Sequence, residues 1–446
     1  MDRMKVVGLI LGSHGTPPDA IDRENPSFKP TPMPESVKEE IREGFTGALP
    51  KDVDFDLMEV RGEHQVIEPP RADAYVVFPF QSIHDRWLHA LYSHNKPLVI
   101  ATLPLAEVFS YGNVYYPYFI RDAREIDERL GLRSKFFLSR NWDDLSLLLR
   151  AIEVDYKLRH TRAVCIGEPM YEPFHSPEWG YAMVRLAQEK FGLTWLQMSS
   201  ESFINLWNEW RGEIDISDIK GRARNIYGLD DEALGEAKKM YLILRSILER
   251  EEANALTINC LASIILRRLN VTPCYALSLL NDEGIPAACE ADTTTLVDML
   301  ITVYASNSPG FMVNPYLFPA DNHLLVSHCT SPTLHRYGDI RRDEFDLRTH
   351  FESNLGVAPQ VFKEVGERVT ITGISHDSLD KMLIVSGEIE ENTLFSTCRS
   401  QVIIRVNDAK GIAESYQGRH WIVVYGDHRE MIGKANEVLG IQSIML

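Results

Sequence analysis

Two acidic residues directly follow a short run of small apolar residues in the second half of the chain. The run at 287–289 is Ala-Ala-Cys, Glu290 comes next, and Asp292 follows two positions later. If the run is a buried strand, these carboxylates stand at its carboxyl end, where α/β proteins bind their ligands. An isolated Glu-x-Asp pair is more often a solvated surface loop, since carboxylates are usually exposed. The pair therefore gains meaning only from other residues that could join it.

Three such residues lie further along the chain, again next to apolar runs. Asn314 and His328 each end a short apolar run, and His420 begins one. A glutamate and two histidines at the ends of different strands could bind a single divalent metal ion. Each histidine taken alone is more often an ordinary core or surface residue. The hypothesis of a metal site thus depends on Glu290, His328 and His420 coming together in the fold.

No other catalytic motif in the sequence competes with this group. The turn at 12–15, Gly-Ser-His-Gly, follows an apolar run but lacks the GxGxxG spacing of dinucleotide-binding loops. The chain contains no Walker loop and no HExxH or GxSxG sequence. Its six cysteines form no CxxC pair, which favours reduced, mostly buried thiols in a cytoplasmic protein.

The composition of the 446 residues is that of an acidic globular protein. Lys and Arg number 46 against 64 Asp and Glu, for a formal net charge of −18. This charge argues against nucleic acid or an anionic membrane as a partner, because both attract positive surfaces. No apolar run reaches the roughly 20 residues that a membrane span requires, so we expect no membrane partner.

Alternating strands and helices are expected to position these residues. Apolar runs recur with helical stretches between them, which indicates parallel sheets covered on both faces. The predicted strands of a first set are 5–11, 54–60, 72–80 and 97–104. Those of a second set are 163–167, 194–199, 254–259 and 273–280, with helices at 177–190 and 231–250. Two α/β domains in series account for this pattern better than one large sheet.

The last part of the chain is expected to be β-rich. Strands separated by turn residues are predicted at 368–373, 382–389, 401–406 and 421–426, as in a barrel or sandwich. We therefore expect three domains. Their bounds are 1–155, 156–308 with Glu290, and 309–446 with His328 and His420.

From about residue 254 onward, the sequence resembles the L-fucose isomerase-like family of aldose–ketose sugar isomerases. The matching stretches are 273–292, 324–330, 366–387 and 419–427, with looser matches at 72–79 and 96–104. The resemblance implies two Rossmann-like α/β domains followed by a β-rich, barrel-like C-terminal domain. It also implies a divalent cofactor, usually Mn2+ with Co2+ or Mg2+ as alternatives, and a homo-trimer or homo-hexamer with sites near subunit contacts.

The resemblance assigns metal-binding positions to four residues. Glu290 matches a metal-binding glutamate after a small apolar strand, and His420 in Gly-Arg-His-Trp matches a late metal-binding histidine. His328 resembles an additional metal-binding histidine of the related arabinose isomerases. Asn314 stands where the family has a second metal-binding carboxylate. These four residues are the metal ligands that the resemblance implies.

The amide of Asn314 departs from the family pattern. An amide oxygen can bind a hard cation, but it is neutral and cannot accept a substrate proton. Three readings stay open: Asn314 is a weaker ligand, a nearby acid such as Asp321 replaces it, or catalysis is lost and only binding remains.

Aldose–ketose isomerisation moves a proton between adjacent carbons. A divalent ion on the two substrate oxygens would polarise the carbonyl and stabilise the enediolate. Glu290 is then the expected proton shuttle, and Asp321 is the first choice for a second acid or base, ahead of Asp292. A hydride shift between the carbons is the alternative route.

Four residues in loops after the predicted N-terminal strands are candidates for substrate binding: His14, Arg61, His84 and Trp87. A deoxyhexose or pentose is the default small-molecule sugar. An acid-substituted hexose such as a sulfosugar is also open, since Arg and His could offset its charge. Two other functions compete: a non-catalytic sugar-binding protein on the same fold, which Asn314 favours, and a metal-dependent epimerase or lyase.

Overall fold

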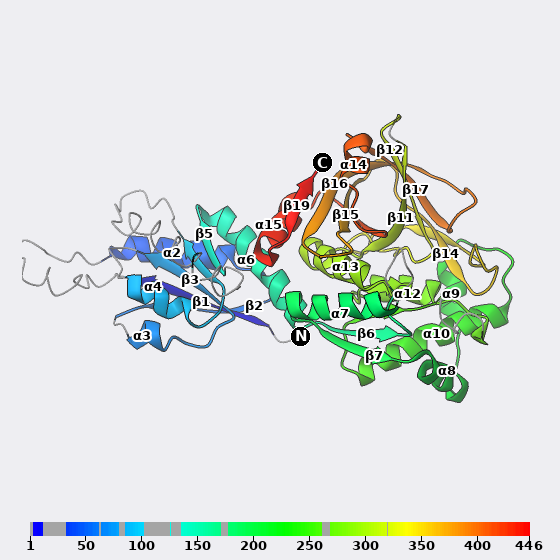
Figure 1. Ribbon diagram of the computed structural model, residues 1–446, viewed down its shortest axis with the longest axis horizontal. Helices are drawn as coiled ribbons and strands as arrows, with labels where there is room; N and C mark the ends of the chain where they lie inside the picture. The colour runs from blue at the N-terminus through cyan, green and yellow to red at the C-terminus, as the bar shows by residue number, and fades with distance from the viewer. Residues whose placement is uncertain are drawn as a thin grey trace, which may run out of the picture. The chain divides into compact units, whose positions relative to one another are not determined.

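The chain folds into two compact units, Met1–Tyr156 and Lys157–Leu446 (Figure 1). The computed structural model describes residues 3–11, 33–61, 64–79, 85–101, 125, 135–170, 177–260, 268–318 and 320–446. Parallel α/β sheets precede a β-rich C-terminal end, so the expected fold class is confirmed. The finer division at 155 and 308 stays a prediction.

A five-stranded parallel sheet forms the centre of the first unit. Its strands are β1 (Met4–Leu11), β2 (Val53–Glu59), β3 (Ala74–Pro79), β4 (Leu98–Ala101) and β5 (Phe136–Ser139). The order β2-β1-β3-β4-β5 is that of a doubly wound α/β fold. The described helices of this part are α2 (Glu35–Ala48), α3 (His64–Ile67), α4 (Asp85–Tyr92) and α6 (Trp142–Arg159). β3 and β4 are buried along their whole length, as in sheets covered on both faces.

A four-stranded parallel sheet opens the second unit. Its strands are β6 (Arg162–Ile166), β7 (Thr194–Met198), β9 (Ala255–Ile258) and β10 (Ala287–Cys289). The order β10-β9-β6-β7 places the first strand of the set between the second and third, so both sheets wind alike. The helices of this part are α7 (Pro177–Phe191), α8 (Ser200–Glu209), α9 (Ser217–Arg222), α10 (Asp231–Arg250), α12 (Cys274–Asp282) and α13 (Thr293–Ser306).

The strand expected at 273–280 is wrong, because this segment forms α12. All residues of α12 are buried, so its sequence has no polar face from which a helical period could be recognised. A continuous apolar run fits a buried helix and a buried strand equally well.

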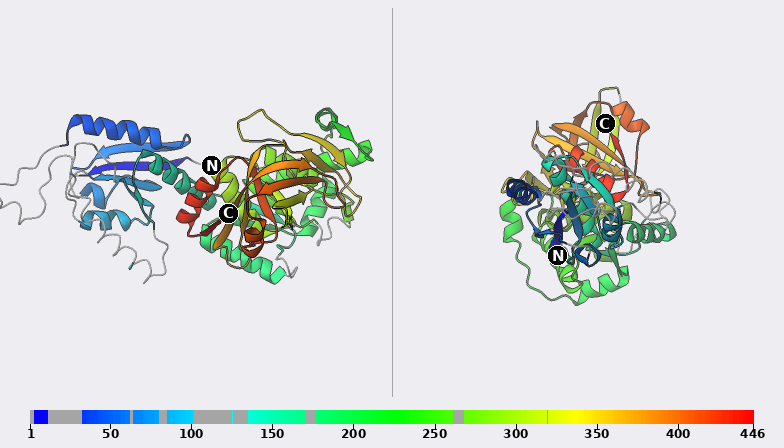
Figure 2. Two further views of the ribbon diagram at one scale, coloured as in Figure 1. Left: turned by 90° about the horizontal axis from the view of Figure 1, so that it is seen from above. Right: turned by 90° about the vertical axis from the view of Figure 1, so that its left-hand side faces the viewer.

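Six antiparallel strands close into a barrel in the C-terminal part (Figure 1 and Figure 2). They are β11 (Phe311–Phe318), β12 (His323–His328), β15 (Arg368–Ile374), β16 (Lys381–Asn392), β17 (Ser400–Val406) and β18 (Trp421–Tyr425). The order is β15-β18-β11-β12-β17-β16, and pairing of β15 with β16 completes the ring. The four strands predicted from the sequence correspond to β15 to β18 and are confirmed.

Shorter elements complete the second unit. β19 (Gln442–Met445) pairs in parallel with the start of β16. A small sheet combines β8 (Asn225–Ile226), β13 (Glu344–Arg348) and β14 (Ala358–Phe362). The remaining helices are α14 (Ala409–Glu414) and α15 (Arg429–Leu439). The loop between β13 and β14 spans residues 349–357.

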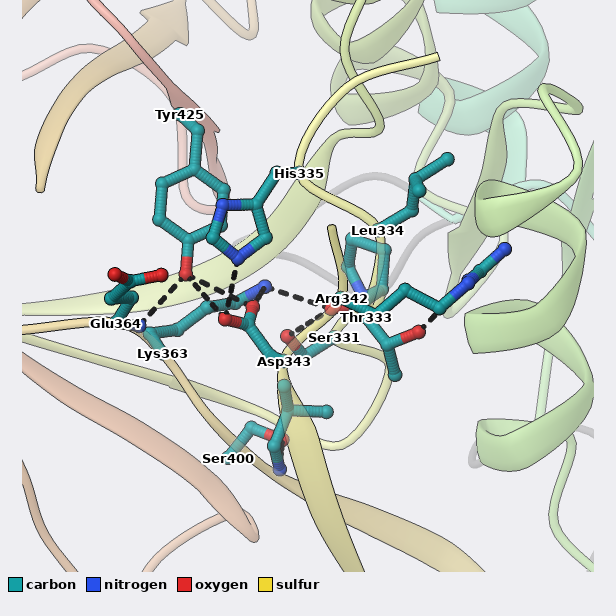
Figure 3. A network of polar contacts seen from close by, with 12 residues as sticks. Ser331, Thr333, Leu334, His335, Arg342, Asp343, Lys363, Glu364, Ser400 and Tyr425 are labelled. Carbon is teal, nitrogen blue, oxygen red and sulfur yellow. Dashed lines mark hydrogen bonds and ion pairs between the residues drawn. The ribbon is translucent and has the colours of Figure 1, made fainter. Parts of the chain in front are cut away.

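A buried polar network joins the segment before β13 to the barrel (Figure 3). The Asp343 carboxylate accepts hydrogen bonds from Lys363 Nζ at 3.0 Å, His335 Nε2 at 2.8 Å and the Tyr425 hydroxyl at 2.9 Å. The His335 ring also stacks on Tyr425, with centroids 4.0 Å apart. Burial alone would raise the pKa of Asp343, but Lys363 and His335 outweigh burial and hold this pKa below its usual range.

Candidate metal centre

The turn from β10 into α13 carries the two acids identified in the sequence. Glu290 and Ala291 both have positive φ angles, 62° and 51°, which non-glycine residues seldom adopt. Hydrogen bonds hold Ala291 on both sides: its N–H donates to Ile258 O and its carbonyl accepts from Met170 N. Asp292 then caps α13 by accepting a hydrogen bond from Thr295 N. The surrounding bonds thus maintain a strained turn that displays Glu290 at the end of β10.

The two histidines come from the barrel. His328 ends β12, and His420 immediately precedes β18. His420 Nδ1 donates to Asp292 Oδ2 at 2.8 Å, and His328 Nδ1 lies 3.0 Å from Thr330 Oγ1. A carboxylate or hydroxyl on Nδ1 fixes the orientation of an imidazole whose Nε2 binds a metal.

Both Nε2 atoms face the Glu290 carboxylate. His328 Nε2 lies 3.6 Å from Glu290 Oε1, and His420 Nε2 lies 3.6 Å from Oε2. One ligand atom of each residue lies within 4.8 Å of the others, and the two rings meet edge to face at 5.8 Å. The structure therefore brings together the glutamate and the two histidines that the sequence singled out.

A metal ion fits this group because one of its nitrogens has no other partner. His420 is fully buried, and its Nε2 makes no hydrogen bond within the part of the chain that the structure describes. A buried polar atom left without a partner is costly. One carboxylate and two imidazoles are common ligands of divalent transition metals.

The carboxylates and the imidazoles of the site stabilise each other's charged forms. Burial alone would raise the pKa of Glu290, but His420, His328 and Arg419 lower this pKa to about 2. Burial would also raise the pKa of Asp292, but the charge of His420 and the hydrogen bonds from His420 and Thr295 hold this pKa far below its usual value. Burial lowers the pKa of His420, and the Glu290 and Asp292 carboxylates more than reverse that effect. Both acids are therefore ionised at neutral pH.

Asn314 borders the same cavity, which encloses about 80 Å³. It is half-buried in β11, paired with Ser327 of β12. Five of the six cysteines also line it: Cys260, Cys274, Cys289, Cys329 and Cys398. The remaining lining residues are Thr272, Glu290, His328, His350, Glu352 and Arg419. Asn314 thus lines the same cavity as Glu290 and His328, and its role as a metal ligand stays a prediction.

The structure does not bring Asp321 to this cavity. Asp321 is exposed in the turn between β11 and β12, where its N–H donates to Phe318 O. Phe318 lies four positions after Asn314, so the turn begins about 13 Å further along the strand. Asp292, the second choice for an acid or base, is close to the site but saturated: it accepts bonds from Thr294 Oγ1, Thr295 N, Thr295 Oγ1 and His420 Nδ1.

The candidate substrate-binding residues of the first half have mixed outcomes. Trp87 is only 6% exposed and belongs to the apolar core of the first unit, so its ring is not presented there to a ligand. Arg61 is exposed, and its backbone N–H donates to Gln65 Oε1. His14 and His84 lie outside the described residues.

Sequence reasoning missed three polar residues of the cavity wall. Arg419 directly precedes His420, so its position beside the site follows once His420 is a ligand. His350 and Glu352 belong to the loop between β13 and β14, and nothing in their local sequence marks them. Only the fold brings that loop to the cavity.

Comparison with known proteins gives a distant likeness. No family model matches the chain. Over 314 residues it is 22% identical to a protein named sulfoquinovose isomerase from Clostridium sp. (strain MSTE9). The alignment covers 66% of this chain and 67% of that protein.

Proposed function

We propose that the chain is a metal-dependent aldose–ketose isomerase. The observation that carries this proposal is the convergence of Glu290, His328 and His420, with the buried Nε2 of His420 making no hydrogen bond to any residue that the structure describes. A divalent ion held by these residues would polarise a sugar carbonyl and stabilise the negative charge of an enediolate. Mn2+ is the first choice, from the resemblance to the L-fucose isomerase-like family. The similarity to a named sugar isomerase supports the same reaction class.

The protein's own residues have separate tasks in this proposal. Glu290 is ionised, so its carboxylate can take a proton from C2 of the sugar and return it to C1. Asp292 holds the Nδ1–H tautomer of His420 and leaves Nε2 free to bind the ion. Deuterium incorporation from D2O separates this route from a hydride shift.

The substrate we propose is a sugar with an acidic substituent, with sulfoquinovose as the first candidate. The named relative acts on sulfoquinovose according to its name. Arg419 lines the cavity next to His420 and supplies a guanidinium, which pairs well with oxyanions. A deoxyhexose and a pentose remain the alternatives.

Assembly and location are predictions of the same proposal. We expect a homo-trimer or homo-hexamer in the cytoplasm, as the resemblance and the reduced cysteines imply. No helix in the described ranges is long and apolar enough to cross a membrane.

A non-catalytic sugar-binding protein is the second candidate, and Asn314 favours it. Asn314 lines the cavity but is neutral, so it cannot replace a carboxylate that accepts a proton. This candidate predicts sugar binding that persists without any turnover.

The test is a screen of Mn2+-loaded protein with sulfoquinovose, L-fucose and L-arabinose, read by NMR in D2O. We expect a ketose product that carries deuterium at C1. Glu290→Gln should reduce turnover by about 10²-fold or more, because it removes the proton acceptor. Conversion of none of the three aldoses by the wild-type protein would contradict the proposal, and bound but unconverted sugar would favour the second candidate.

A further inference from the structure

The isomerisation proposed above needs two proton movements, and Glu290 accounts for one. The C2 proton must reach C1, and the proton of the C2 hydroxyl must reach O1. Asn314 cannot accept a proton, and Asp321 lies away in the hairpin turn. All four hydrogen bonds that Asp292 accepts come from residues of the fold. A further acid–base group is therefore required.

Glu352 is the other carboxylate in the cavity wall. Among the described residues that line the cavity, the acids are Glu290 and Glu352. Glu352 is exposed toward solvent, and no hydrogen bond or ion pair to a described residue engages its carboxylate. Glu290, Glu352 and Cys398 line the same cavity, and the negative charges of both acids add to the effects of Cys329 and burial that raise the pKa of the Cys398 thiol.

The loop that carries Glu352 is firmly held. Its turn is closed by the Asn354 N–H donating to His350 O at 2.9 Å and the His350 N–H donating to Leu355 O at 3.0 Å. Arg399 Nε donates to Thr349 O at 2.7 Å, which ties the loop to the start of β17.

A left-handed glycine seals the other end of the same loop. Gly356 has φ of 59°, and a Cβ there would lie only 2.5 Å from Thr272 N. The backbone that carries Glu352 is thus fixed at both ends of the loop, which keeps this residue at the cavity wall.

We propose that Glu352 is the second acid–base residue of the isomerase and moves the hydroxyl proton, an assignment that rests on the proposed function. Glu290 takes the C2 proton, the C–H electron pair forms the C1–C2 double bond, and the carbonyl pair moves to O1. Glu352 takes the O2 proton and delivers it to O1. The O2 pair then forms the C2 carbonyl and the pair of the C1–C2 double bond takes the proton from Glu290 at C1, so no atom or electron is gained or lost.

The variants Glu352→Gln and Glu352→Asp distinguish proton transfer from shape. Glutamine keeps the size of the side chain but has no basic oxygen, whereas aspartate is shorter and keeps the carboxylate. With Mn2+ and sulfoquinovose, we expect Glu352→Gln to lower kcat by about 10²-fold or more. Glu352→Asp should retain more activity than Glu352→Gln, and the KM and Mn2+ affinity of both should stay within about threefold of wild type.

Glu213→Gln is the matched control, because Glu213 is exposed and does not line the cavity; its kcat should not change. An active wild type with unchanged kcat in Glu352→Gln would overturn the role of Glu352 and leave the proposed function standing. A parallel loss of Mn2+ affinity, or an aspartate variant worse than the glutamine variant, would also overturn it. A wild-type protein that converts none of sulfoquinovose, L-fucose and L-arabinose would overturn both proposals together.

Discussion

Two buried carboxylates of the second unit, Asp343 and Asp292, each form a hydrogen bond with a histidine, yet one belongs to a structural network and the other to the candidate metal centre. Asp343 accepts hydrogen bonds from His335, Lys363 and Tyr425, and the Lys363 ammonium balances its negative charge (Figure 3). Asp292 accepts hydrogen bonds from His420 and from Thr294 and Thr295 in the first turn of α13.

The groups that face each imidazole make the difference clear. His420 lies between Asp292 and Glu290, and its Nε2, 3.6 Å from Glu290 Oε2, makes no hydrogen bond to a described residue. His335 instead turns its Nε2 into the carboxylate. A buried carboxylate–imidazole pair therefore indicates a ligand site where a second carboxylate faces the imidazole, and a structural network where a lysine completes the charge balance.

The largest expected effect concerns the structural network. Lys363→Met leaves Asp343 buried without its ammonium, which should lower the free energy of unfolding by about 3–5 kcal/mol. Urea unfolding measures this loss, and Mn2+ affinity should not change. Lys410→Met, at an exposed ion pair, is the control and should cost less than about 1 kcal/mol. A Lys363 variant as stable as the control would show that the network does not hold the barrel.

The next effect concerns the metal centre. Asp292→Asn removes the charge that orients His420, so Mn2+ affinity measured by calorimetry should weaken about 10–100-fold. Asn remains a good N-cap, so α13 should persist. Asp230→Asn is the matched control, because Asp230 caps α10 in the same manner and lies outside the cavity wall. Equal affinities in the two variants would exclude the orienting role of Asp292.

The smallest effect is a difference in pH dependence. The raised pKa of His420 means that the metal-free site still carries a proton above the usual histidine range, so metal binding must release it. Mn2+ affinity should therefore fall as the pH drops through neutrality, with proton release visible in buffers of different ionisation enthalpy.

The contribution of Asp343 to stability changes only at acidic pH. Its pKa is depressed on folding, so its contribution to stability is complete above the unfolded value of about 3.9 and is lost as the pH falls through the folded value. Stability should thus be insensitive to this group near neutrality. A metal affinity that is flat between pH 8 and 6 would contradict the first half of this contrast.

Strand ends were the most predictable part of the molecule. Glu290 and His328 stand where apolar runs stop and His420 stands where one begins, and turn residues separate the predicted barrel strands. The helical segment α12 could not be recognised, because it is buried on every side. Asp321 was a candidate to replace Asn314 because it lies near Asn314 in sequence, but it belongs to the turn of the β11–β12 hairpin, which lies away from the cavity.

Residues that reach the site only through long-range packing left no local signal. Glu352 and His350 are more than 50 residues from Glu290 along the chain, and only the sheet of β13 and β14 places them at the cavity. The role predicted for Asp292 from the sequence differs from the one its contacts support, and the reason is similar. Its position beside Glu290 suggested catalysis, whereas its bond to His420 across 128 residues identifies it as an orienting group.

The central claim is that Glu290, His328 and His420 hold one divalent ion. Anomalous diffraction from crystals of the Mn2+-loaded protein tests it most directly. We predict a single strong manganese peak about 2.0–2.6 Å from a Glu290 oxygen and from Nε2 of both histidines. A strong peak elsewhere in the protein, or none at these three side chains in saturated crystals, would contradict the account.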